Sequence, residues 1–301
     1  MAYELNRNEP GTLAARHILR QQVRRALQAL ARRELSDAAV HSARKDLKKA
    51  RATLRLLRPA LGDTTYKREN AALRDAARPL SLARDSTALL AQLDKLIDRY
   101  GTTARELALD TLRQELRREH RAARRKLRQR EMLTPHLAAL QGVHDRSVRW
   151  RVGRHGWTIL GAGLKGVYAS GRGALGVARG KRSPENLHEW RKHVKYLWHQ
   201  LQLLTPLWPG LLGELADQAH QLADYLGDDH DLAVLRVKVL ERRDLFPDLA
   251  TRRGLLALVD QCRTELEDKA VVLGERIFEE KPQAFAARLG QYWSGWHRVR
   301  S

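Results

Sequence analysis

The sequence contains very little cysteine or phenylalanine and has no long apolar run. Its 301 residues include one cysteine, Cys262, and three phenylalanines. A single cysteine excludes an intrachain disulfide and any zinc site built from cysteines. Few phenylalanines and few runs of Val or Ile argue against a large sheet. No run of 18 apolar residues is present and the first residues carry no apolar signal core, so we expect a soluble, cytoplasmic protein.

The charge, by contrast, is strongly one-sided. Lysine and arginine number 56 against 35 aspartate and glutamate residues, which gives a net charge of +21. Hydrophobic residues make up 43% of the chain, which is enough for a buried core, and the richness in Ala, Leu and Arg favours helices. A positive excess of this size indicates a polyanionic partner: nucleic acid, an anionic membrane or a phosphate polymer.

Helical periodicity dominates, and no convincing strand pattern is present. Breaks are expected at Thr134-Pro135 and between Gly153 and Gly156. The glycine-rich residues 158–179 have a spacing that suggests a helix face closely approached by a neighbour, with a loop as the alternative. The expected helices cover residues 13–31, 38–57, 66–78, 81–99, 103–131, 158–179, 184–206, 210–226, 229–244, 250–279 and 282–296.

The sequence repeats itself with an offset of 147 residues. His41 aligns with His188 and Pro59 with Pro206, without a gap. The aligned basic pairs are Arg44 with Arg191, Lys45 with Lys192 and Lys48 with Lys195. Arg84-Asp85 matches His230-Asp231 at an offset of 146. These matches indicate an internal duplication, and we predict two equivalent helical bundles, residues 1–155 and 156–301, packed about a pseudo-twofold axis.

The repeated helix has two faces in each copy. Apolar residues recur at steps of three and four and predict the buried face: Leu47, Ala50, Leu54 and Leu57 in the first copy. Basic residues recur at steps of three, four and seven and predict one charged face: His41, Arg44, Lys45, Lys48, Arg51 and Arg55, then His188, Arg191, Lys192, Lys195 and His199.

Like charges four residues apart destabilise a helix mildly, and a bound polyanion would offset that repulsion. A basic run is usually only a solvated face. Such faces usually mix charges of both signs, however, and this one recurs with its histidine at the same register, which favours a binding surface.

These features together resemble the CHAD domain, an α-helical domain named for its histidines. The resemblance rests on the repeated His-x-x-Arg-Lys-x-x-Lys helix, on the duplication, and on the segment Leu-Gly-Asp-Asp-His-Asp-Leu-Ala at residues 226–233, and it extends from about Leu13 to Trp296. It implies an all-α fold of two pseudo-symmetric four-helix bundles with a basic groove or channel between them. It also implies binding of inorganic polyphosphate, location at polyphosphate granules, and no catalytic activity.

The resemblance also implies which residues contact polyphosphate. In addition to the basic faces of the repeated helix, it points to Tyr196 in the second copy. Trp198 departs from the pattern, because it stands at a position that is often basic. The remaining implied residues are Lys165, Tyr168 and Arg172, their first-half counterparts Arg20 and Arg24, and Arg117, Arg121, Arg124, Arg125 and Arg128.

Several motifs suggest chemistry but have simpler explanations. His188-Glu189 with His193 has one residue too many for the zinc motif H-E-x-x-H. Residues 228–231 are expected to begin a helix, with Asp229 or Asp231 capping it or pairing with a basic neighbour. The resemblance makes Asp85 and Asp231 structural partners of the basic helices. Residues 265–269 match E-x-E-x-K, which works on a strand, whereas helix is expected here. Tyr292, Trp293 and Trp296 are expected in the core.

We therefore expect a polyphosphate-binding module without enzymatic activity, cofactor or metal. Nucleic-acid binding is the alternative, although no recognisable reading element is present. A phosphohydrolase would need an acidic metal-binding cluster, which the sequence does not offer, and binding to an anionic membrane would be tested by liposome flotation. Histidines beside phosphates are expected to favour their protonated form, so binding should strengthen from pH 8 to 6.

Overall fold

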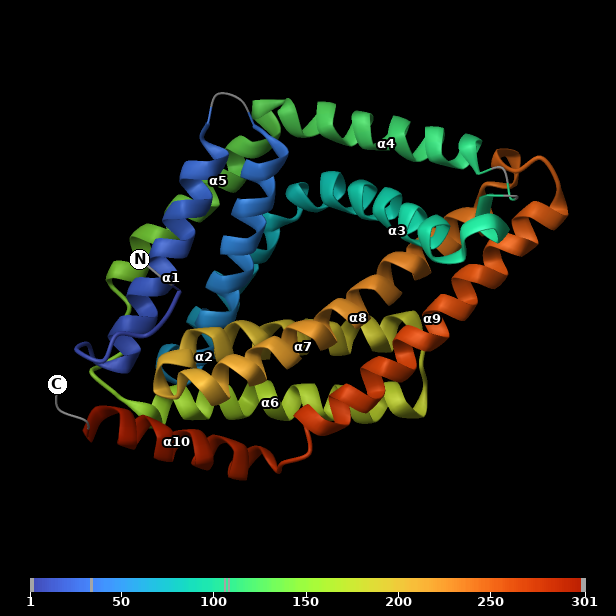
Figure 1. Cartoon of the computed structure of the whole chain (residues 1–301). Helices are drawn as coiled ribbons and strands as arrows, with labels where there is room; N and C mark the ends of the chain where they lie inside the picture. The colour runs from blue at the N-terminus through green and yellow to red at the C-terminus, as the bar shows by residue number, and fades with distance from the viewer. Residues whose placement is uncertain (1–2, 33–34, 106, 108, 299–301) are drawn as a thin grey trace.

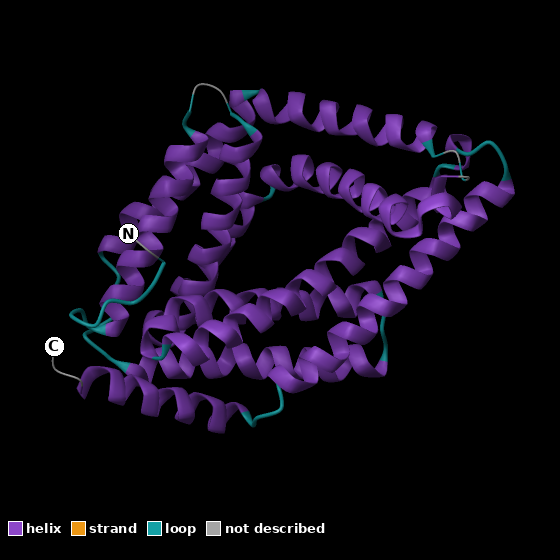
Figure 2. Cartoon of the chain, in the orientation of Figure 1, coloured by secondary structure: helices purple, strands orange, loops and turns teal. Residues whose placement is uncertain are grey.

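The structure is a computed structural model that describes residues 3–32, 35–105, 107 and 109–298, without the side chains at 82–85, 103–105, 128 and 130. This part of the chain is helical and contains no strand, which confirms the all-α class (Figure 2). The helices are α1 (Gly11–Leu30), α2 (Asp37–Ala77), α3 (Pro79–Arg105), α4 (Asp110–Arg128), α5 (Arg130–Val148), α6 (Trp157–Gly180), α7 (Pro184–Leu204), α8 (Pro209–Glu241), α9 (Leu249–Ile277) and α10 (Pro282–Arg298).

The helices are arranged as a four-sided frame (Figure 1). Helices α1, α2 and α5 pack together on one side, and α6, α7 and α10 form the adjacent side. Helices α8 and α9 rise from there and meet the far end of α3, while α3 and α4 run back to α2 and α5. Helix α2 also packs against α6 and α7, so the two predicted halves are in direct contact.

Two apolar clusters hold this frame together. The larger cluster includes Leu47 and Leu54 of α2 together with Leu160 of α6 and Trp190 of α7. The smaller cluster joins the distal parts of α3, α4, α8 and α9. Since each cluster contains residues from before and after position 155, the apolar core is shared by the two predicted domains and is not divided between them.

The structure differs from several of the predicted helix boundaries. Helix α2 continues through Pro59 to Ala77, with a change of direction at Gly62, whose φ of 72° suits a residue without a Cβ. Thr134-Pro135 lies inside α5, and the break predicted there occurs instead at Gln129, which has an extended backbone. The two helices predicted over residues 210–244 are one helix, α8.

The glycine-rich segment is a regular helix, α6, so the loop alternative is wrong. Gly163 explains part of its composition: a Cβ there would lie 2.4 Å from the backbone oxygen of Leu56 in α2. The close approach predicted from glycine spacing is therefore confirmed at Gly163. It is wrong for Gly166, Gly173 and Gly176, whose Cβ positions face open space.

None of the helices in the described ranges is both long enough and apolar enough to cross a membrane.

Candidate functional site

The two repeated helices begin in the same way. Ser36 accepts a hydrogen bond from the backbone N–H of Ala39 at 3.1 Å, and Ser183 accepts one from the backbone N–H of Asn186 at 3.3 Å. Both serines are N-caps, which satisfy a backbone donor that the first helical turn leaves open. Their offset in the sequence is the same as that of His41 and His188, so the structure starts α2 and α7 at equivalent points.

The apolar faces predicted for these helices are confirmed. Leu47 and Leu54 of α2 are fully buried, as are their counterparts Val194 and Leu201 of α7. Because side chains three and four residues apart share one side of a helix, burying this face turns the basic residues between its members toward the surface.

Basic side chains line a pocket of about 420 Å³ beside α2, which we call the α2 pocket. Arg44, Lys48 and Arg51 form one wall, and Arg74 and Arg78 from the end of the same helix form another. The one acidic lining residue is Asp75, which accepts a hydrogen bond from Arg74 Nε at 2.8 Å. That bond lowers the pKa of Asp75. Five basic side chains against this one carboxylate give the pocket a positive excess.

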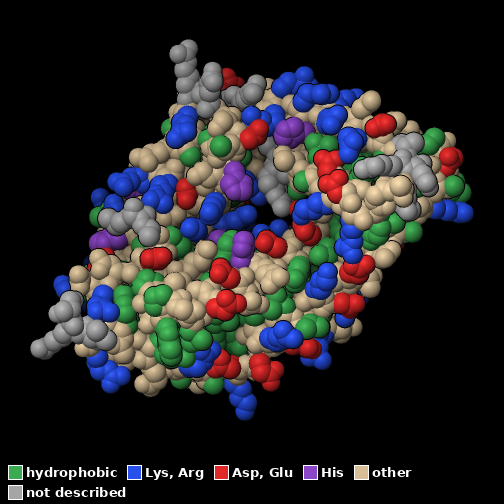
Figure 3. Space-filling model, viewed as in Figure 1, with side chains coloured by type: hydrophobic (Ala, Val, Ile, Leu, Met, Phe, Trp, Pro, Cys, Tyr) green, Lys and Arg blue, Asp and Glu red, His purple; other side chains and the backbone are tan. Residues whose placement is uncertain are grey.

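Arg44 Nη1 donates a hydrogen bond to Ser81 Oγ at 2.7 Å, which fixes the guanidinium at the pocket wall. Figure 3 shows Lys, Arg and His side chains around a hollow near the middle of the molecular face, together with some Asp or Glu side chains. His41 and Lys45 are exposed nearer the start of α2 and do not line the pocket.

The basic residues of α7 pack against the segment of α8 that the sequence singled out. A Cβ on Gly227 would lie 3.3 Å from Arg191 Nη2, so the glycine leaves room for this guanidinium. The rings of His188 and His230 are 4.4 Å apart. Lys192 forms an ion pair with Glu189, which also contacts His193 at 3.3 Å. The neighbouring acid therefore offsets part of the charge at Lys192.

Tyr196 connects the two basic helices. Its ring centroid lies 3.5 Å from the guanidinium carbon of Arg55 and 5.7 Å from that of Arg51, so an α7 residue contacts the basic face of α2 directly. Asn70 Oδ1 accepts a hydrogen bond at 3.2 Å from each arginine. Burial lowers the pKa of Arg55. Arg55, Arg58 and His193 also line a second pocket of about 590 Å³ between α2 and α6.

Two of the residues predicted at the site are buried in the core. Tyr168 is 0% exposed, is stacked on Phe285 at 4.0 Å, and donates a hydrogen bond to the Ile277 carbonyl at 2.9 Å. Burial raises its pKa to about 12. His199 is 1% exposed. Neither side chain can reach a polymer in solvent, so we correct the prediction and remove both residues from the site.

Other predicted residues lie away from the α2 pocket. Lys165 Nζ donates to Gln283 in α10 and Arg172 Nε donates to the carbonyl of Phe278, so this part of α6 faces α10 and the end of α9. Arg20 and Arg24 line a separate pocket formed with the N-terminal segment. The predicted grouping of these four residues with the repeated basic helices is therefore not seen.

The arginines of α4 form a separate exposed stripe. Arg117, Arg121 and Arg125 are exposed, whereas Arg124 pairs with Asp37 at 2.6 Å and so joins α4 to the start of α2. The side chain of Arg128 lies outside the described residues.

Sequence reasoning missed several residues of the two pockets beside α2. Arg74, Arg78 and Ser81 line the α2 pocket, and Arg58 and His193 line the second one. Arg74 and Arg78 are four residues apart within the helix expected over residues 66–78, so a search for a second basic stripe would have found them. The sequence would not have shown that they face Arg44, Lys48 and Arg51, because that arrangement depends on the change of direction at Gly62.

The acidic segment of α8 has structural partners. Asp229 is buried and accepts a hydrogen bond from Arg263 Nε at 2.8 Å, which confirms the predicted pairing with a basic neighbour. Asp228 pairs with Lys95 at 2.9 Å. The segment lies within α8, so the predicted helix start is wrong. The side chain of Asp85 lies outside the described residues.

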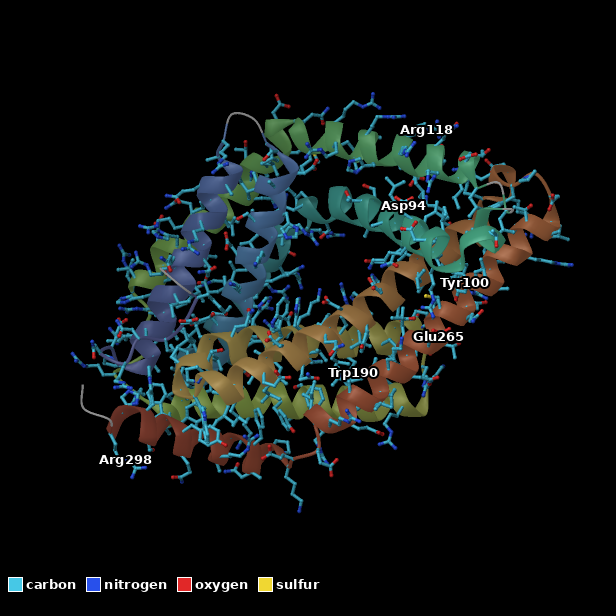
Figure 4. The ribbon with its side chains drawn as sticks, viewed as in Figure 1. Asp94, Tyr100, Arg118, Trp190, Glu265 and Arg298 are labelled. Carbon is cyan, nitrogen blue, oxygen red and sulfur yellow. The ribbon has the colours of Figure 1, made fainter. Side chains whose placement is uncertain are left out.

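The E-x-E-x-K match lies on helix α9, as predicted, and its Glu265 pairs with Arg99 of α3, beside Tyr100 (Figure 4). No group of three or more metal-binding side chains occurs in the described part of the chain. Trp293 is buried in the larger cluster, and Tyr292 and Trp296 pack against it, so their predicted core positions are confirmed.

The half-buried histidines of α7, His188 and His193, have lowered pKa values in the unliganded protein. Burial lowers the pKa of His188, with a further contribution from the charge of Arg191. Burial also lowers the pKa of His193. The predicted preference for the charged form concerns a histidine beside bound phosphate, so it stays a prediction for the complex.

His199 should make the stability of the fold depend on pH. Burial lowers its pKa to about 3, against 6.5 for an unfolded histidine. Between pH 6.5 and 3, the unfolded chain therefore binds a proton at His199 that the folded protein does not bind. The contribution of neutral His199 to the free energy of unfolding is fully present above pH 6.5 and is lost as the pH is lowered toward 3. When the pH is lowered from 7.5 to 5.5, we expect the free energy of unfolding of the wild type to fall by about 1.4 kcal/mol more than that of His199→Phe, as measured by urea unfolding. Equal losses would contradict a neutral His199.

The family profile described as "CHAD domain" matches residues 10–239, which include α1 to α7 and nearly all of α8. No curated protein matches the chain. The matched region contains both repeated helices, the α2 pocket and the acidic segment of α8, and it covers well over half of the sequence. The chain therefore belongs to the CHAD domain family.

Proposed function

We propose that this protein binds inorganic polyphosphate through the basic residues of α2 and α7. The observation that carries the proposal is the α2 pocket, where Arg44, Lys48, Arg51, Arg74 and Arg78 converge on about 420 Å³. Membership of the CHAD domain family supports the same ligand, because the family resemblance implies polyphosphate binding.

The physical basis is multivalent capture of a flexible polyanion. Arginine can span two phosphate oxygens with its planar fork, and lysine supplies a mobile point charge. Each contact is modest, but contacts along one polymer reinforce one another, and released counterions add to the driving force. We infer that the repeats are pseudo-symmetric copies that contribute basic faces to one groove. Tyr196 supports this inference, since it brings α7 against Arg51 and Arg55.

This role is binding, without catalysis, and we propose that it holds the protein at polyphosphate granules in the cytosol. Arg44, Arg51 and Arg55 remain in the proposed site with Lys48, Arg191 and Lys195. The exposed His41, Lys45 and Lys192 extend it along the helix surface.

The test is a comparison of affinities at fixed salt and equal phosphate concentration. Long-chain polyphosphate, tripolyphosphate, single-stranded DNA and duplex DNA are titrated into the full-length protein. We expect long polyphosphate to bind tightest, and its affinity to fall steeply as salt rises. Equal affinity for polyphosphate and both DNAs would overturn the proposal and favour nucleic-acid binding.

Polyphosphate affinity should rise as the pH falls from 8 to 6. Burial keeps the pKa of His188 low in the free protein, and a bound polyanion would raise it, so binding takes up a proton. Titrations at pH 8, 7 and 6 check this, with His188→Ala as the variant that should flatten the profile. A wild-type affinity that does not change with pH would remove the histidines from the anion contact.

A further inference from the structure

A cavity of about 710 Å³ lies between α1, α5 and the chain segment before α1, and we call it the N-terminal pocket. It is larger than the α2 pocket and shares no lining residue with it. Residues 4–7 and Glu9 form one wall, α1 forms another, and His144 of α5 closes part of the rim. The described segment before α1 lies beside this helix in Figure 1.

The wall before α1 is firmly held. The backbone N–H of Leu5 donates to the carbonyl of Leu203 at 3.0 Å. The Tyr3 hydroxyl donates to the carbonyl of Lys49 at 3.1 Å and contacts Thr53 Oγ1 at 2.9 Å. Tyr3 and Leu5 are both buried. The pocket is therefore formed by the fold itself, and a ligand would meet a wall that is already ordered.

One basic side chain of the pocket has a nitrogen without a hydrogen-bond partner. Arg20 Nε is buried without a hydrogen-bond partner, although a buried donor of a charged group is costly to leave open. Arg24 lies one helical turn further along α1 on the same wall and is exposed. His17, by contrast, pairs with Glu9 at 2.5 Å. Two arginines one turn apart offer the paired forks that hold a phosphate group.

The rest of the pocket suits an organic body. Leu5, Ala14 and Ile18 supply buried apolar surface, and the exposed carboxylate of Glu4 can accept hydrogen bonds from ligand hydroxyl or amino groups. The volume lies within the range of pockets for small organic ligands, which is about 300–1,000 Å³. The two carboxylates of Glu4 and Glu9 disfavour a long polyanion by charge repulsion. The pocket wall before Pro10 lies outside the family match.

We propose that the N-terminal pocket binds a small organic phosphate monoester of nucleotide size. Its phosphate contacts Arg20 and Arg24, and its organic body lies against Leu5 and Ile18. This site is independent of polyphosphate binding, because the two pockets share no residue.

The test uses adenosine 5′-monophosphate as the probe, titrated calorimetrically into the full-length protein, with adenosine and inorganic phosphate as part-ligands. We expect the nucleotide to bind at least tenfold tighter than either part. Arg20→Gln should weaken it by about tenfold or more, because a charge-assisted contact is lost, and Arg20→Lys should restore part of the loss. Arg44→Gln, in the α2 pocket, should leave nucleotide binding unchanged.

Three outcomes would overturn the proposal: no binding of the nucleotide at millimolar concentration, equal binding of inorganic phosphate, or displacement of the nucleotide by long-chain polyphosphate. Circular dichroism of each variant separates a lost contact from a lost fold. Polyphosphate is titrated into the same variants to keep the two hypotheses distinct. If polyphosphate does not bind at the α2 pocket, Arg44→Gln will leave the affinity for polyphosphate unchanged, while Arg20→Gln will still weaken nucleotide binding.

Discussion

Replacing Arg44 with glutamate is expected to weaken the binding of long-chain polyphosphate by about a hundredfold. Arg44 lines the α2 pocket and is held there by Ser81. The substitution removes a charge-assisted contact, and the new carboxylate both repels phosphate and attracts Lys48 one turn along the helix. Reversal therefore costs more than simple loss of the charge.

The repeat predicts a similar effect in the second copy. Arg191→Glu places an acid at the aligned position of α7, beside Gly227 of α8. The alanine variants of His41 and His188 should weaken binding less than either reversal, because alanine removes a contact without adding a carboxylate that repels phosphate.

The matched control is Arg117→Glu. Arg117 is exposed on α4 and lines neither pocket beside α2. Because arginine is replaced by glutamate in both variants, Arg117→Glu changes the net charge by the same amount as Arg44→Glu. Affinity is measured at one salt concentration, and circular dichroism checks the fold. If Arg117→Glu and Arg44→Glu weaken binding equally, the protein responds only to overall charge and the α2 pocket is not the site.

Replacing Gly163 with valine should lower the free energy of unfolding by about 3 kcal/mol. A Cβ at this position would lie 2.4 Å from the backbone oxygen of Leu56 and 2.6 Å from its Cα. Backbone atoms cannot move aside as the end of a flexible side chain can, so α6 must shift away from α2. Leu56 lies beside Arg55, and the shift would therefore also disturb the second pocket.

Gly166→Ala on the same helix is the matched control. Its Cβ position faces open space, so alanine meets no steric penalty there and should stabilise the helix by up to about 1 kcal/mol. Urea unfolding of both variants against the wild type measures the two effects. A Gly163→Val protein as stable as the wild type would show that α6 and α2 are not in close contact.

The local pattern at α2 and α7 was readable from the sequence, because helical periodicity depends only on neighbouring residues. Leu47 and Val194 were predicted on buried faces, and both are fully buried. The pairing of Asp229 with a basic residue was also predicted. Its partner, Arg263, was not, since it belongs to a helix far along the chain.

Tyr168 and Arg20 show what helical spacing alone does not predict. Both stand at helical spacing from neighbours of the kind expected for a polyanion site, yet Tyr168 packs on Phe285 of α10 and Arg20 lines the N-terminal pocket. Spacing along a helix shows which side chains share a face, but not which helix covers that face. The covering helix is chosen by packing between distant segments.

By itself, the sequence determined the all-helical class, the repeated basic helix and the net positive charge. These properties follow from composition and from contacts within single helices. Only the tertiary structure decided that Arg74 and Arg78 join Arg44 in one pocket, that Tyr168 and His199 are buried, and that Arg20 and Arg24 belong to a separate cavity. Those outcomes depend on the direction that α2 takes at Gly62 and on the helices that pack around α6.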